Sequence, residues 1–206
     1  MNPRKFILLA ILVLCLPIAA LADSGVDFTN DGGALTGSNS GFSLSGSTLV
    51  SVNGLNGGGL ITGNNLGGVA FTTGALVSGS LQMGGSFASG GTFTITGNGS
   101  DGLPNGTIFT GSFNGPVTWT LVTLANGTHN YTLSGTLTGT LGNVSTNGVT
   151  IQLTINTGKG FFDGSTMISS GDTRIENMTV PEPGTLTLLG TGLIGIAGVL
   201  RRKINH

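Results

Sequence analysis

The sequence predicts an all-β fold, and three features of residues 23–179 lead to that class. Apolar and polar residues alternate along several runs, Asn-Gly and Asp-Gly pairs occur between the runs, and no stretch shows a sustained helical period. Successive side chains of a strand point to opposite faces of its sheet, so a period of two marks a strand with one buried and one wet face. The pattern predicts an antiparallel Gly/Thr/Ser-rich β-sandwich of about ten short strands.

The clearest alternation lies in the second half of the chain. In YTLSGTLTGTL, residues 131–141, a tyrosine and three leucines share one face, and threonines and a serine share the other. VTIQLTI, residues 149–155, repeats this arrangement, and TFTIT (92–96) and PVTWT (116–120) are shorter examples. Threonine suits the wet face because its branched Cβ favours extended backbone.

Five Asn-Gly or Asp-Gly pairs predict tight hairpin turns, because these residues tolerate a positive φ. They occupy residues 53–54, 101–102, 105–106, 126–127 and 147–148. Between Gly25 and Gly91 the chain has more glycine and weaker alternation, so a β-solenoid is the alternative for this half. No fixed repeat period accompanies it, and the sandwich remains the first prediction.

The N-terminus has the pattern of a secretory signal. Two basic residues in MNPRK precede the apolar run FILLAILVLCLPIAALA, which ends at a small-residue site formed by Ala20 and Ala22. This order predicts a signal peptide over residues 1–22, cleaved by signal peptidase before Asp23. The single cysteine, Cys15, lies inside this segment, so the predicted mature chain has no disulfide, thiolate metal site or cysteine nucleophile.

The charge of the segment between the two termini, which we call the body, argues against one class of partner. Residues 23–180 contain seven acidic and two basic residues, a net charge of −5. Nucleic acid binding needs clustered lysine and arginine to neutralise phosphates, so we expect no nucleic acid partner.

Candidate catalytic and metal-binding residues are few. His129, the one histidine of the body, has no second histidine or paired acid at a useful spacing, and we expect it in a surface turn. Trp119 alternates with threonines and is expected in the core rather than on a sugar-stacking platform. Asp27 and Asp31, and separately Asp101, lie in Asn- and Gly-rich loops that could offer oxygens to calcium, but turn chemistry explains them without an ion. The sequence therefore predicts a protein without catalytic residues or cofactor.

The C-terminal segment, residues 180–206, predicts a membrane anchor. Residues 185–200 carry no charge and would span about 24 Å as a helix. Arg201, Arg202 and Lys203 follow as a stop-transfer cluster that holds the tail in the cytoplasm. Together with the signal peptide, this places the body outside the cytoplasm.

Before the predicted helix stands Pro181-Glu182-Pro183. Each proline fixes its own φ and pushes the preceding residue toward extended geometry, so the segment is stiff and cannot join a sheet or helix. The order of motif, Gly-bearing apolar run and basic cluster resembles the PEP-CTERM sorting signal of bacterial proteins. The resemblance implies recognition of the motif by an exosortase, transient anchoring in the inner membrane, and release or transfer to the cell surface. It also implies an association with exopolysaccharide and biofilm matrix.

Two functions follow as hypotheses. The first is a non-enzymatic, exported surface or extracellular-matrix protein sorted through its PEP motif. The second is a carbohydrate-binding module delivered by the same route, which would need exposed aromatic side chains or an organised polar face. A surface hydrolase is the least favoured class, because it requires clustered acids or a triad.

Overall fold

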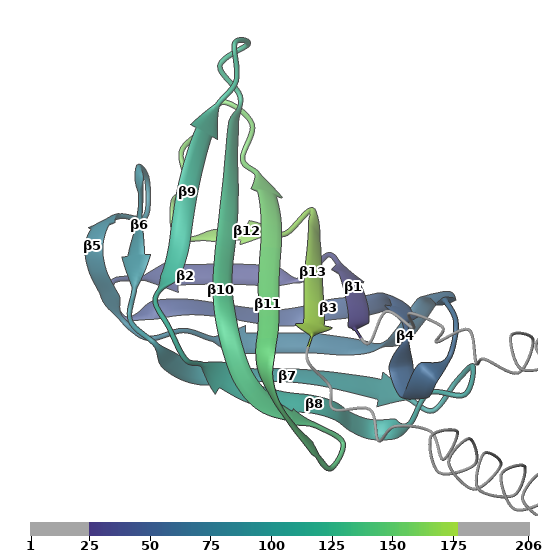
Figure 1. Ribbon diagram of the computed structural model, residues 1–206. Helices are drawn as coiled ribbons and strands as arrows, with labels where there is room; N and C mark the ends of the chain where they lie inside the picture. Colours follow the sequence, from purple (N-terminus) through teal and green to yellow (C-terminus); the bar gives the residue numbers. More distant parts are fainter. Residues whose placement is uncertain (1–24, 177–206) are drawn as a thin grey trace, which may run out of the picture. The chain divides into compact units, whose positions relative to one another are not determined.

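The computed structural model describes residues 25–176, which form thirteen β-strands and one short 3-10 turn (Figure 1). The strands of the first half are β1 (Val26–Asp31), β2 (Ala34–Ser38), β3 (Gly41–Asn53), β4 (Ile61–Thr72), β5 (Leu76–Ser80), β6 (Gly84–Phe87) and β7 (Gly90–Asn98). Those of the second half are β8 (Asn105–Phe113), β9 (Val117–Thr123), β10 (His129–Leu141), β11 (Val144–Asn156), β12 (Ser165–Met167) and β13 (Ser170–Glu176). The 3-10 turn η1 (Leu55–Gly57) follows β3, and the described residues contain no α-helix.

Eight of the strands close into a barrel. The hydrogen-bonded order is β11-β13-β1-β3-β4-β7-β8-β10, and β10 pairs in turn with β11. Every pair in this ring is antiparallel. The prediction of an antiparallel all-β domain is therefore confirmed. The predicted sandwich is wrong, because hydrogen bonds continue around the ring instead of stopping at the edges of two separate sheets. The solenoid alternative is also wrong, since the first half of the chain forms antiparallel neighbours rather than stacked coils.

Long, irregular strands allow this closure. β3, β10 and β11 have thirteen residues each, and the pairing register shifts within both β3 and β10. Such bulges bend a strand and increase its twist. At Gly46 of β3 the backbone takes a φ of +67°, which a glycine adopts without strain, between two register-matched stretches. In Figure 1, β10 and β11 curve across the direction of β3, β4 and β7, as strands of a closed sheet must.

Two side arms branch from the ring at β3 and β10. Residues 129–134 of β10 pair with β9, whereas residues 137–141 pair with β8. β9 continues through β6 to β5, which ends the sheet. On the other side, residues 41–45 of β3 pair with β2, and β2 pairs with β12.

The alternating residues lie on the predicted faces. Within β10, the leucines and the tyrosine of the predicted apolar face are buried, as are Val149, Ile151, Leu153 and Ile155 of β11. The apolar positions of the two shorter runs are buried as well: Phe93, Ile95, Val117 and Trp119. The threonines between them line the outer surface or are partly exposed. The period of two thus identified one side of these strands correctly.

Five aromatic side chains fill the space between the two side arms. Trp119 stacks on Tyr131 with ring centroids 4.7 Å apart and an interplanar angle of 13°, and it contacts Phe42 at 4.7 Å and Phe162 at 5.4 Å. Phe87 lies 4.6 Å from Phe42. These rings come from β3, β6, β9, β10 and the loop after β11, so their packing joins elements that are distant in sequence. We call them the aromatic cluster.

Two hydrogen bonds tie the turn between β5 and β6 to this cluster. The indole Nε1 of Trp119 donates to the carbonyl oxygen of Leu81 at 2.7 Å. The hydroxyl of Tyr131 donates to the carbonyl oxygen of Gln82 at 2.7 Å and accepts from the backbone N–H of Phe162 at 3.1 Å. One buried hydroxyl thus connects the β5–β6 turn with the loop after β11.

We expect Tyr131→Phe to lower the free energy of unfolding by about 1–3 kcal/mol, because it leaves the buried N–H of Phe162 without an acceptor and removes the donor to the carbonyl of Gln82. Denaturant titration followed by circular dichroism measures this change. Thr110→Val, which removes an exposed hydroxyl on β8, is the control and should change stability by less than about 0.5 kcal/mol. An equal effect of the two substitutions would contradict the connecting role of the Tyr131 hydroxyl.

The turn predictions are confirmed in part. Residues 101–102 and 126–127 lie in turns, whereas Asn53 ends β3 and Gly54 leads into η1; the three glycines have φ between +80° and +83°. Residues 105–106 instead begin β8, paired with β7. Residues 147–148 lie within β11, where two residues oppose one residue of β10, so this pair forms a bulge rather than a turn. The hairpin between β10 and β11 turns at Gly142, with a φ of +57°.

Candidate functional site

The predicted sorting and processing residues lie outside the described residues. These are Ala20, Ala22 and Asp23 of the signal-peptidase site, Pro181, Glu182 and Pro183 of the motif, and Arg201, Arg202 and Lys203 of the basic cluster. The predicted helix over residues 185–200 lies outside them as well. Within residues 25–176, no helix has the length and apolar character needed to cross a membrane.

The structure does not bring the calcium candidates together. Asp27 and Asp31 lie four residues apart on β1, about 13 Å along the strand, and Asp101 lies in the turn between β7 and β8. Asp27 contacts Arg174, and Asp31 accepts a hydrogen bond from the backbone of Gly32. In the part of the chain that the structure describes, no three His, Cys, Asp or Glu side chains gather in a way that could hold a metal ion.

His129 is not the surface turn residue that the sequence led us to expect. It begins β10 and is only 8% exposed. Its Nδ1 lies 3.2 Å from the carbonyl oxygen of Gly160, and its ring stacks on Phe161 with centroids 4.2 Å apart. The prediction failed because the loop after β11 folds back over the start of β10, which the local sequence does not show. His129 thus holds that loop in place.

The exposed aromatic surface is small. Trp119 is 2% exposed, which confirms its predicted place in the core. Among the described phenylalanines, Phe161 is the one large exposed ring, at 47%. A planar platform of aromatic rings for stacking on sugars is therefore not present on the described surface.

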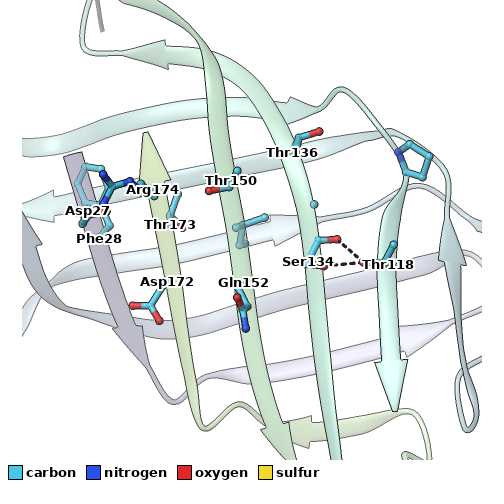
Figure 2. Close-up of a pocket in the computed structure, with 13 residues that line it drawn as sticks. Asp27, Phe28, Thr118, Ser134, Thr136, Thr150, Gln152, Asp172, Thr173 and Arg174 are labelled. Carbon is cyan, nitrogen blue, oxygen red and sulfur yellow. Dashed lines mark hydrogen bonds and ion pairs between the residues drawn. The ribbon is translucent and has the colours of Figure 1, made fainter. Parts of the chain in front are cut away.

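A polar groove crosses the outer face of β9, β10, β11, β13 and β1. It has a volume of about 610 Å³, and we call it the outer groove (Figure 2). Its lining includes four hydroxyl side chains, one amide, two carboxylates and one guanidinium: Thr118, Ser134, Thr136, Thr150, Gln152, Asp27, Asp172 and Arg174. The groove lies where the wet faces of five neighbouring strands meet, so its polar character follows from the same alternation that buries the core.

The register of the strands arranges these side chains in two rows. One row runs from Asp172 through Gln152 and Ser134 to Thr118, each residue paired with the next. The other runs from Asp27 through Arg174 and Thr150 to Thr136. Figure 2 shows both rows on adjacent strands. Neighbouring positions in a row are about 4.8 Å apart, the spacing of strands in a sheet.

Contacts at both ends of the rows fix several of these groups. The Oγ atoms of Ser134 and Thr118 are 2.6 Å apart, and Thr29 donates to Asp172 at 2.9 Å. Arg174 Nη1 lies 3.2 Å from the Asp27 carboxylate, and its Nε donates to Glu176 at 2.8 Å. The arrangement offers donors and acceptors to a polar ligand from a rigid surface.

Sequence reasoning did not identify the outer groove. Each wet face was visible as a run of threonine, serine and glutamine at every second position. The missing information was the pairing: Asp27 and Arg174 are 147 positions apart in sequence yet lie on adjacent strands.

Comparison with known families matched the C-terminal segment. The model of the PEP-CTERM protein-sorting motif matches residues 179–203, which include the Pro-Glu-Pro triplet, the apolar run and the basic cluster. The comparisons with curated proteins and with solved structures gave no match. The motif implies export, transient membrane association and processing by an exosortase. The chain therefore carries a PEP-CTERM protein-sorting motif at its C-terminus.

Proposed function

We propose that this chain is a non-enzymatic structural protein of the cell surface or extracellular matrix, delivered there by exosortase-type sorting. The observation that carries the proposal is the match of the sorting motif to residues 179–203, directly after a barrel that ends at Glu176. A sorting signal at the end of a folded domain is the arrangement expected of a passenger that is exported, held and then released.

Each part of the tail has a role in this proposal. Pro181, Glu182 and Pro183 present a stiff, extended segment for recognition by the exosortase. Residues 185–200 are the temporary inner-membrane anchor, and the basic cluster holds the C-terminus in the cytoplasm. The barrel then stands in the periplasm until processing sends it to the surface or matrix.

The composition of the barrel supports a structural role. Its interior is packed with aliphatic and aromatic side chains, and its one histidine is used to hold a loop. A catalytic site needs a nucleophile or general base next to a polarising group within a cleft. The outer groove is lined by no histidine and no lysine, and its arginine contacts two carboxylates.

The intact mass of the protein in envelope and medium fractions tests the proposal. We expect a released form that begins at Asp23 and ends near Pro183, and an added mass at its end would identify an attachment. A protein that still ends at His206 in every fraction would show a permanent anchor and would overturn the sorting mechanism.

Carbohydrate binding is the second candidate. The described surface lacks the aromatic platform that this function would commonly use. The outer groove, however, is an organised polar face large enough to contact a sugar chain. The outer groove therefore supports carbohydrate binding as the second candidate function and is the place where the sugar would bind.

A further inference from the structure

We propose that the outer groove binds an uncharged, hydroxyl-rich polysaccharide, with Gln152 and Thr150 at the centre of the contact. This inference rests on the proposed delivery to the cell surface, because that is where the protein would encounter such a polymer. The chemistry of the site comes from the groove itself.

The centre of the groove offers hydrogen-bonding groups that the protein does not use. Gln152 and Thr150 project from β11, the middle of the five strands, and both residues are exposed. Among the described residues, neither side chain has a hydrogen-bond partner. The groups on either side are already held in place, Thr118 with Ser134 and Asp172 with Thr29. A ligand lying across the strands would therefore meet free groups between fixed ones.

The groove does not suit an apolar ligand or a peptide. The two large apolar side chains that line the groove, Phe28 and Ile151, are at most 2% exposed, and Pro116 is the exposed apolar residue of its lining. A lipid or an apolar side chain would meet Pro116 and threonine methyl groups there, each next to a polar group, and no large exposed apolar side chain. An extended peptide adds to a free sheet edge, but the backbone groups beneath the groove are already paired with neighbouring strands.

The charges of the groove disfavour an anionic polymer. Arg174 contacts both Asp27 and Glu176, and Asp172 adds a further carboxylate. These four groups carry a net charge of −2, and residues 25–176 carry six acids and two bases. A polyuronate or nucleic acid would be repelled. Hydroxyl, amide and carboxylate groups together supply both donors and acceptors, which is what the hydroxyls of a neutral sugar need.

Size and rigidity also fit a polymer. Five strands measure about 19 Å across, enough to contact several consecutive sugar units. The threonine side chains are stiff at χ1, and a paired sheet loses little freedom on binding. The strands and the threonines of the site are therefore ordered before the ligand arrives, and Gln152 is the side chain that binding must fix.

Affinity electrophoresis of the protein as isolated from cells, processed or full-length, tests the proposal directly. The native gels contain hydroxyethyl cellulose or galactomannan as neutral polymers, or alginate as the anionic one. We expect retardation by at least one neutral polymer and none by alginate. Gln152→Ala and Thr150→Val should each weaken binding by about two- to tenfold, the effect of one hydrogen bond. The control Thr110→Val, on an exposed position of β8, should bind like the wild type.

Three results would contradict the binding proposal. Failure of both neutral polymers to retard the protein would overturn the proposal, as would preferential retardation by alginate. An equal loss of binding in the Thr110→Val control would show that the contact lies elsewhere on the barrel. Intact mass tests the sorting proposal independently of polymer binding. A processed protein that binds no polymer would refute the binding inference and leave sorting in place. A protein that binds polymer but is never processed would refute sorting and leave the binding inference in place.

Discussion

Replacing Glu182 by alanine is expected to leave export intact and to block removal of the C-terminal tail. Glu182 is the single charged residue between Glu176 and Arg201, so it is the one fixed charge that a processing enzyme can contact there. Loss of a hydrogen bond to a charged group is worth about 1.5–3 kcal/mol, which slows processing by about ten- to 100-fold. Cell fractionation with intact mass should find a chain from Asp23 to His206 in the membrane fraction.

Two further variants separate the motif from general effects of charge. Glu182→Gln keeps the size of the side chain and removes its charge, and it should resemble Glu182→Ala if charge is what the enzyme reads. Glu176→Ala removes an acid at the end of β13, outside the motif, and should be processed normally. Wild-type processing of Glu182→Ala would show that this glutamate is not recognised.

The largest effect on stability is expected from Trp119→Ala, which should lower the free energy of unfolding by about 3–5 kcal/mol. The substitution removes the ring at the centre of the aromatic cluster and leaves the carbonyl of Leu81 without its donor. Domains of this size are stable by about 5–15 kcal/mol, so a substantial part of the total would be lost. Trp119 is the single tryptophan of the chain, so unfolding must be followed by circular dichroism instead of its fluorescence.

Trp119→Phe distinguishes packing from hydrogen bonding at this site. It keeps an aromatic ring between the side arms and removes the indole donor, so we expect a smaller loss of about 1–3 kcal/mol. A Trp119→Ala protein within about 1 kcal/mol of the wild type would mean that the aromatic cluster does not hold the side arms together.

Local pattern was sufficient for part of the fold and not for the rest. The alternation of Leu133 with Thr132 and Ser134 has a local cause, the opposite orientation of successive side chains, and the structure has the predicted faces. Closure into a barrel depends on contacts between the first and last strands, and no periodicity within either strand specifies that partner. The sequence analysis also did not predict the burial of His129, because the residues that cover it, Gly160 and Phe161, lie in a loop distant in sequence.

The sorting motif and the outer groove also differ in how far the sequence alone could predict them. The sorting motif is a contiguous segment whose chemistry can be read residue by residue, and the family match agrees with that reading. The outer groove combines side chains such as Gln152 and Asp172 from five strands, and their proximity is a product of strand order. A sequence without known strand neighbours cannot show it.

The position of β13 sets the order of events during export. This last strand lies between β1 and β11, so the ring cannot close until the end of the domain has crossed the membrane. Residues 177–184 then leave at most about 28 Å of extended chain between the barrel and the predicted membrane helix. In the proposed sorting route, we therefore expect the barrel to close while the tail is still attached, so that the sorting enzyme meets a finished domain and not a nascent one.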